Sequence, residues 1–329
     1  MKRLSLVQII AVIVIIVMFL LVGCEQKTVE EKKAYYVGGN QGIQMKFVDG
    51  APPDYVFDNG QSPFAIGVKL ENKGEDVVEQ DEIKLTIQGI DANKFGVSPS
   101  DLRDATITEP ELLGVSKTVT GDILKGGETE IYFSDLNYLE DEPGTFTRNI
   151  RASICYNYQT ESIIELCIKS RLYEEEEAIC SISGPKESFN SGAPIHITSV
   201  TENPLGEGKI QFSFKVEHVG SGKIFSINDD QCEDIKTNIE RNKVYIEIGQ
   251  INGRFPTCNG LEGSLTGHSG FIRIGGLTSA EPATRTISCT LDVSDVEGVF
   301  VDNLDILLDY NYLDYIEKEL EIRDVSIGD

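Results

Sequence analysis

The 329-residue sequence contains no tryptophan, only three histidines and few basic residues. Its 29 lysines and arginines stand against 54 aspartates and glutamates, which gives a formal net charge of −25 at pH 7. A surface with this excess of negative charge repels nucleic acid and anionic lipid headgroups. The chain is therefore not expected to bind nucleic acid, and its acidic surface is expected to be a solvated exterior.

Motifs that carry catalytic or cofactor chemistry are also missing from the sequence. It has no Walker loop, no H-E-x-x-H and no C-x-x-C, and His196, His218 and His268 stand apart from one another. Residues 267–270 do not complete a G-x-S-x-G nucleophile turn, because Phe271 stands where a glycine is required. His268 is expected in an exposed loop. We expect no enzyme activity, no cofactor and no metal site.

The apolar run at the N-terminus, residues 4–22, follows Lys2 and Arg3. A basic segment, an apolar segment and a small residue at its end are typical of a secretory signal. Residues 21–24, Leu-Val-Gly-Cys, resemble the lipobox of prokaryotic lipoproteins, which implies cleavage before Cys24 and a lipid attached to it. The alternative is an uncleaved signal anchor, since about twenty apolar residues also span a bilayer. Both alternatives tether the rest of the chain to the extracytoplasmic face of the cell membrane.

Two patterns of alternating apolar and polar residues occur twice, in the same order. Residues 66–74, IGVKLENKG, recur as residues 212–220, FSFKVEHVG. Later in each half, a strand-like segment leads into Tyr-Asn-Tyr, at residues 156–158 and again at residues 310–312. Because both matches lie about 150 residues apart, the sequence indicates a duplicated domain. About 305 exported residues are enough for two domains with cores of their own.

Short alternating segments separated by Gly, Asn, Asp and Pro clusters fill the rest of both halves. About seven such strands in each half predict an all-β protein made of two tandem antiparallel β-sandwiches. The tyrosines of both Tyr-Asn-Tyr segments share the phase of the core aliphatic residues and are expected in the core. Further predicted strands lie at residues 83–87, 128–133, 244–248 and 286–293.

The strand form apolar-x-apolar-x-apolar-x-Asn-x-Gly, followed late in the copy by a Tyr-rich strand, resembles the cell-adhesion-related (CARDB-like) Ig-like domain of bacterial and archaeal surface proteins. Asn72 and Gly74 keep this form, whereas His218 replaces the asparagine in the second copy. The resemblance implies tandem Ig-like domains in a prokaryotic surface lipoprotein. The implied role is adhesion, envelope scaffolding or protein–protein interaction. The alternative is a ligand-binding or delivery module of a membrane complex.

These observations predict the domain boundaries. Residues 1–23 are a lipoprotein signal peptide or signal-anchor helix, and residues 24–39 are a polar tether. A first Ig-like domain, the first copy, spans residues 40–173, and a second, the second copy, spans residues 193–329. Between them, residues 174–192 form a linker that begins with four glutamates, expected to be an exposed, self-repelling joint. An envelope or surface protein is the expected partner, and the loops of the second copy, farthest from the membrane, are expected to bind it.

Six cysteines follow Cys24, and an even number in an exported chain predicts three disulfides. A hairpin turn placed at residues 160–162 brings Cys155 opposite Cys167 while it also pairs the core residues, so this bridge is predicted. The other four cysteines allow three connectivities, of which Cys232 with Cys258 and Cys180 with Cys289 is the favoured one.

The densest cluster of oxygen ligands outside the linker lies at residues 228–234. Asp229, Asp230, Glu233 and Asp234 follow Asn228 there, and Ca²⁺ prefers such oxygen ligands. The cluster lacks the alternation and the central glycine of an EF-hand loop. The alternative is an ordinary acidic loop.

Overall fold

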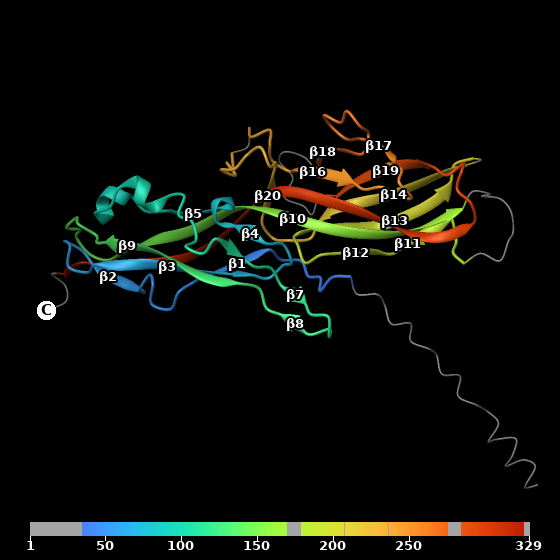
Figure 1. Ribbon diagram of the computed structural model, residues 1–329. Coiled ribbons are helices and arrows are strands. Elements are labelled where there is room, and N and C mark those ends of the chain that lie inside the picture. Colours follow the sequence, from blue (N-terminus) through green and yellow to red (C-terminus); the bar gives the residue numbers. More distant parts are fainter. Residues whose placement is uncertain (1–34, 170–178, 207, 236, 276–283, 326–329) are drawn as a thin grey trace, which may run out of the picture. The chain divides into compact units, whose positions relative to one another are not determined.

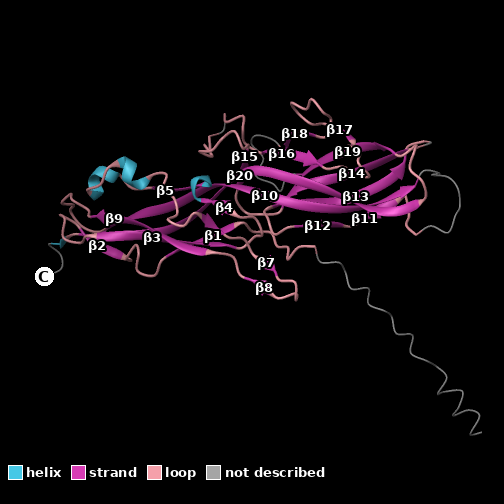
Figure 2. Ribbon diagram, viewed as in Figure 1, coloured by secondary structure: helices cyan, strands magenta, loops and turns pink. Residues whose placement is uncertain are grey.

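The computed structural model describes residues 35–169, 179–206, 208–235, 237–275 and 284–325. The predicted signal segment and Cys24 lie outside the described residues, as does most of the predicted tether. Residues 35–329 form one compact unit. Strands dominate it, and the described helices are three short 3₁₀ turns, none of which is long and apolar enough to cross a membrane (Figure 2). The predicted all-β class is confirmed.

The first half of the unit is a sandwich of two sheets (Figure 1). One sheet has the order β1-β3-β9, and β3 buries Ile66, Val68 and Leu70 on alternate positions. In the other sheet, β5 pairs with the long strand Phe146–Lys169, and β2 pairs with the long strand Val299–Arg323. The elements of this half are β1 (Ile43–Phe47), β2 (Tyr55–Phe57), β3 (Phe64–Asn72), β4 (Val78–Glu79), η1 (Gln80–Glu82), β5 (Ile83–Gln88), η2 (Ala92–Phe95), η3 (Pro99–Leu102), β6 (Glu111–Leu112), β7 (Ser116–Lys117), β8 (Ile123–Leu124) and β9 (Glu128–Leu136).

The second half repeats this arrangement. One sheet has the order β11-β13-β14-β19-β17, and the other contains β12, β16, β18 and β15 beside the same two long strands. The sequence repeat is visible in the pairing, because β1-β3-β9 corresponds to β13-β14-β19. The elements are β11 (Gly184–Lys186), β12 (Ser188–Asn190), β13 (Ile195–Pro204), β14 (Lys209–His218), β15 (Lys223–Phe225), β16 (Lys243–Ile248), β17 (Thr257–Asn259), β18 (Ser269–Arg273) and β19 (Thr284–Asp292).

The two long strands are β10 (Phe146–Lys169) and β20 (Val299–Arg323), and they form one uninterrupted antiparallel ladder. The hairpin turn predicted at residues 160–162 is therefore wrong, because Thr160 lies opposite Leu308 in mid-strand. Its segment, Gln-Thr-Glu-Ser, has no Gly, Pro, Asn or Asp to favour a turn. The second Tyr-Asn-Tyr segment, residues 310–312, likewise continues in β20 without a turn. Alternation of side chains is identical in a hairpin and in a straight strand, so the pattern alone did not separate them.

The ladder makes the two halves exchange parts of their last strands. The first part of β10 pairs with β5, and its second part pairs with β12 of the other half. Likewise β20 pairs first with β16 and, at its C-terminal end, with β2 of the first half. Asn157 lies opposite Asn311, 154 residues later, so equivalent residues of the two copies face each other about a local twofold axis. The two halves therefore share strands across the predicted linker, residues 174–192. The assignment to tandem Ig-like domains stays a prediction.

The predicted core tyrosines are buried, and their hydroxyls reach the facing sheet. Tyr158 donates to Asn72 Oδ1 at 3.1 Å, and the equivalent Tyr312 hydroxyl lies 3.0 Å from His218 Nε2. His218 therefore makes, in the second copy, the contact that Asn72 makes in the first. The difference between the two copies at this position preserves a hydrogen bond between the sheets.

The six described cysteines form three disulfides, as predicted, but each pairing differs from the predicted one. Cys155 cannot reach Cys167 because both lie in the same straight strand, twelve positions apart. The observed bridges are Cys155–Cys232, Cys167–Cys180 and Cys258–Cys289, which replace the predicted Cys155–Cys167, Cys232–Cys258 and Cys180–Cys289. Cys258 and Cys289 are directly opposed in β17 and β19.

Candidate functional site

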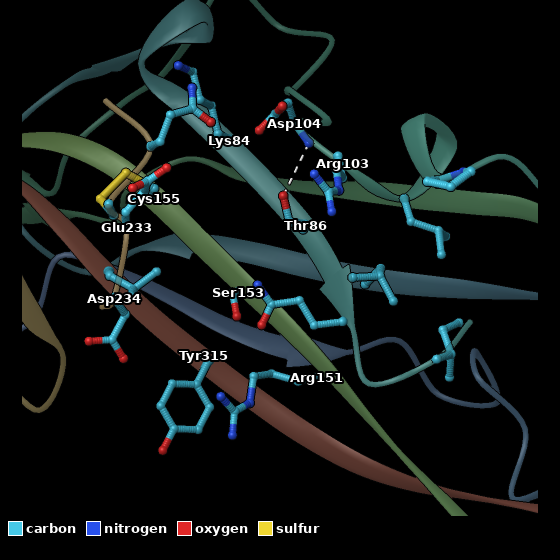
Figure 3. Close-up of a pocket in the computed structure, with 18 of the residues that line it drawn as sticks. Lys84, Thr86, Arg103, Asp104, Arg151, Ser153, Cys155, Glu233, Asp234 and Tyr315 are labelled. Atoms are coloured by element: carbon cyan, nitrogen blue, oxygen red, sulfur yellow. Dashed lines mark hydrogen bonds between the residues drawn. A yellow bond between two sulfur atoms is a disulfide. The ribbon is translucent and has the colours of Figure 1, made fainter. Parts of the chain in front are cut away.

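A cavity of about 640 Å³ opens on the outer face of β10 and β20, where the two halves meet. Figure 3 shows it between β5, the long strands and a loop of the second half. The first half supplies β5 and the segment around η3, and the second half supplies the segment 231–234. Because both copies line it, a change in either copy alters the same site.

The loop that closes one side of the cavity, residues 226–241 with residue 236 outside the described residues, is held to the long strands. The Cys155–Cys232 disulfide joins it to β10. Asn311 of β20 donates from Nδ2 to the carbonyl oxygens of Ser226, at 3.2 Å, and Asp229, at 2.9 Å. These tethers fix a loop that otherwise has little regular structure, so the cavity wall is preformed.

The floor of the cavity combines a ring with charged groups. The Arg151 guanidinium lies over the Tyr315 ring, 4.4 Å from its centroid, and pairs with Glu317 at 2.6 Å. The hydrogen bond from Arg151 holds the pKa of the Glu317 carboxyl below its ordinary value. Ser153 lies beside these groups, and the Arg103 side chain lies on the opposite wall (Figure 3). Such a surface offers stacking, cationic and hydroxyl contacts to a bound group.

Basic side chains gather at this cavity although the chain as a whole is acidic. Lys84, Arg103, Arg151 and Lys223 line it. Lys84 of β5 pairs with Asp230 of the second half at 2.5 Å, and this hydrogen bond lowers the pKa of the Asp230 carboxyl. Basic and acidic side chains are therefore both present at the cavity, whereas the composition predicts a mainly acidic exterior.

The residues predicted as a cation cluster are used as loop contacts. Asp229 accepts hydrogen bonds from Asn238 Nδ2 and from the Gln231 backbone, and Asp230 pairs with Lys84. Asp234 pairs with Lys223 and Arg241, and Glu233 lines the cavity. Among the described residues, no group of three or more His, Cys, Asp or Glu side chains is arranged to hold a metal ion. The acidic loop thus joins the halves through the Asp230–Lys84 pair, whose members are 146 residues apart in sequence, so spacing along the chain did not indicate it.

His268, predicted in an exposed loop, lies just before β18 and is half-buried. Its ring stacks on Phe255, with centroids 3.8 Å apart. His196 lies in β13 and its Nε2 is 3.0 Å from the Gly39 carbonyl oxygen. His218, which is hydrogen-bonded to Tyr312, lies on the neighbouring strand β14. Because Ile195 pairs with His218 and Glu217 pairs with His196, the two histidine side chains lie on opposite faces of the sheet.

The comparisons with known proteins give no family. No family model matches the chain, and no curated protein matches it. A solved structure with some likeness is that of CfaE, the adhesive subunit of CFA/I fimbria of enterotoxigenic Escherichia coli, at 9% identity over 87% of this chain and 84% of that one. Its TM-score is 0.10, so this likeness carries no argument about fold or function.

Proposed function

We propose that the chain is a membrane-anchored extracytoplasmic protein, without enzymatic activity, that acts in adhesion, envelope scaffolding or protein–protein interaction. The observation that supports this most is the cavity walled by both halves and braced by the Cys155–Cys232 disulfide. A rigid, preformed surface lowers the entropic cost of binding a partner. Three disulfides suit the oxidising compartment that the N-terminal signal implies.

The partner surface that we propose is this cavity together with the adjoining residues 226–241. It offers a mixed-charge rim and one exposed ring, Tyr315, which is the composition of a polar interface with an aromatic anchor. This position differs from the sequence-based prediction, which assigned the partner to the loops of the second copy alone.

Crosslinking on intact cells tests the proposal. Arg103→Glu reverses a charge on the cavity wall, and it should lower recovery of the crosslinked partner by about five-fold or more, since like charges and lost contacts at a binding surface weaken association. Lys46→Glu on β1 is the matched control, because it makes the same change of charge at an exposed position outside the cavity.

Equal recovery from Arg103→Glu and Lys46→Glu would contradict the cavity as the partner site. Loss of recovery on substitution of Leu265, a fully exposed residue in a second-copy loop, would return the site to that loop. Turnover of a substrate by the purified chain would contradict the non-enzymatic role.

A second function, capture or delivery of a small ligand, is favoured by the cavity volume alone. About 640 Å³ falls within the range of small-molecule sites, roughly 300 to 1,000 Å³. Native mass spectrometry of protein purified from its own cells distinguishes the two functions, because a captured ligand adds a constant mass that Arg103→Glu should remove.

A further inference from the structure

The β7–β8 hairpin extends away from the sheets of the first half (Figure 1), and it carries exposed apolar side chains. Val119, at its tip, is fully exposed, and Leu113, Ile123 and Leu124 are each exposed by more than half. Four exposed aliphatic side chains thus lie within twelve residues. The other large apolar side chains that are exposed in the described part of the chain are more widely spread. Exposed apolar clusters of this kind mark contact sites for a protein or a membrane.

The apolar side chains point to both faces of the hairpin. In its register, Ser116 lies opposite Leu124 and Lys117 lies opposite Ile123. Paired residues share a face and neighbours along a strand do not, so Ile123 and Leu124 lie on opposite faces. A partner docked on one face would leave the other apolar face in water. An apolar medium that surrounds the tip covers both.

The tip is preformed, with several of its backbone groups bonded internally. The Thr118 amide donates to the Asp122 carbonyl at 2.8 Å, and the Gly121 amide donates to the Thr118 carbonyl at 2.9 Å. The Asp122 amide donates to Thr118 Oγ1 at 3.0 Å. Backbone groups satisfied in this way lower the cost of moving a turn out of water.

The charge of the hairpin differs from that of the chain. Residues 112–127 contain two lysines, Lys117 and Lys125, and one acidic residue, Asp122. The whole chain has 54 acidic and 29 basic residues. Lysines beside an apolar tip are attracted to the anionic headgroups that repel the rest of the protein.

The base of the hairpin lies beside the point where the described chain begins. The Val115 amide donates to the Gly74 carbonyl at 2.6 Å, and the next residue, Glu75, accepts from the amides of Val37 and Gly38 at 2.9 and 2.8 Å. Only residues 25–34 separate Tyr35 from Cys24, a stretch that reaches at most about 40 Å when fully extended. An anchor at Cys24 therefore keeps the base of the hairpin close to the membrane.

We propose that the β7–β8 hairpin inserts its tip into the lipid headgroup region as a second membrane contact. This inference rests on the proposed membrane anchoring and deepens it. One attachment through a tether leaves the body free to tumble, whereas a second contact orients it. Binding through two such signals is also firmer than through one.

A single tryptophan tests this, because the chain has none of its own. Val119→Trp places an indole at the tip, and Leu265→Trp places one at another fully exposed position as the matched control. Each full chain is reconstituted in vesicles of phosphatidylcholine with about 30% phosphatidylglycerol, with and without bromine on the acyl chains. We expect blue-shifted emission and about two-fold or greater quenching for Val119→Trp, and neither for Leu265→Trp.

Two further measurements fix the interpretation. Lys117→Glu with Lys125→Glu, added to Val119→Trp, should lower the quenching in the anionic vesicles and leave it unchanged in pure phosphatidylcholine. Equal quenching of both tryptophans in vesicle-bound protein would overturn the proposal and leave the hairpin to a protein partner or to water.

Failure of the anchor is separable from failure of the hairpin. If mass spectrometry and vesicle flotation show that the full chain is not anchored, the proposed anchoring is wrong. The compact unit 35–329, which contains all three disulfides, is then added to the same vesicles. Greater quenching of Val119→Trp than of Leu265→Trp would still support insertion, and equal quenching would overturn it.

Discussion

At the scale of single residues, His218 does in one half what Asn72 does in the other. Asn72 Oδ1 accepts a hydrogen bond from the Tyr158 hydroxyl, and His218 Nε2 is hydrogen-bonded to the hydroxyl of the equivalent Tyr312. The two side chains differ in one respect, because histidine titrates near neutral pH and asparagine does not. Burial lowers the pKa of His218 below its ordinary value of 6.5, so this ring is neutral in the folded protein at neutral pH.

His218→Asn should make the stability of the protein less sensitive to acid. Between the lowered pKa of the folded state and 6.5, the unfolded chain binds more protons at this position, so stability falls as the pH falls through this window. Asparagine keeps a hydrogen-bonding group there, as Asn72 does, and removes the titration. The slope removed is at most about 1.4 kcal/mol per pH unit.

Urea unfolding of both proteins at pH 7.5, 6 and 5 measures this difference. His196, whose pKa is also lowered by burial, is present in both and cancels in the comparison. Parallel stability curves over this range would contradict the role given to His218.

At the scale of elements, the loop 226–241 depends on the disulfide that binds it to β10. Cys155→Ser with Cys232→Ser opens a bridge that spans 77 residues of sequence, and we expect a loss of roughly 4.5 kcal/mol on the chain-entropy estimate. Cys167→Ser with Cys180→Ser is the matched control. That bridge spans only 13 residues, so its loss should cost roughly 3 kcal/mol and leave the loop 226–241 bound to β10.

Chemical denaturation gives the two free energies, and hydrogen exchange of residues 226–241 shows whether the loop opens. Faster exchange in this loop should follow only from loss of Cys155–Cys232. Equal exchange in both double variants would mean that Asn311 and the Lys84–Asp230 pair hold the loop without the disulfide.

Much of the strand pattern could be predicted from the sequence, since Ile66, Val68 and Leu70 mark a half-buried strand by alternation alone. The duplication was also visible, and β3 and β14 occupy equivalent places. The straight course of β10 was not predictable in this way, because alternation does not record where a strand finds its neighbour. The Cys155–Cys167 pairing depended on the assumed hairpin and failed with it, because the partners of these cysteines are Cys232 and Cys180.

The candidate site was less accessible still to sequence reasoning. Lys84 meets Asp230 across 146 residues of sequence, and Arg151 meets Glu317 across 166. Neither pair belongs to a motif. Asp229 to Asp234 was recognised as an acidic cluster, but the role of Asp230 depends on Lys84, which the fold brings to it from β5 of the other half.

At the scale of the whole molecule, neither copy has a complete sandwich of its own. A chain that ends near Tyr173 loses all of β20, including Leu320 and Ile322, which are buried in the first half. It also leaves Ile164 and Leu166 of β10 without the second half that covers them. We expect this truncated chain to be unfolded or aggregated.

Near-ultraviolet circular dichroism and thermal melting of the truncated chain, compared with residues 35–329, test this expectation. A cooperative melt and a native-like spectrum from the truncated chain would show that the first copy folds alone, as independent tandem domains would. The same result would mean that the first sandwich is stable without the strand that the second half contributes to it.

The exchange of strands also sets an order of events during synthesis and export. The last residue of β10 leaves the ribosome about 130 residues before the first residue of β20, a delay on the order of ten seconds at ordinary elongation rates. During that interval the distal part of β10 is an unpaired edge with apolar side chains, which is the kind of segment that aggregates. Neither sandwich is complete until β20 has been synthesised. The arrival of this one strand therefore determines when the exposed edge of β10 is covered and the risk of misassembly ends.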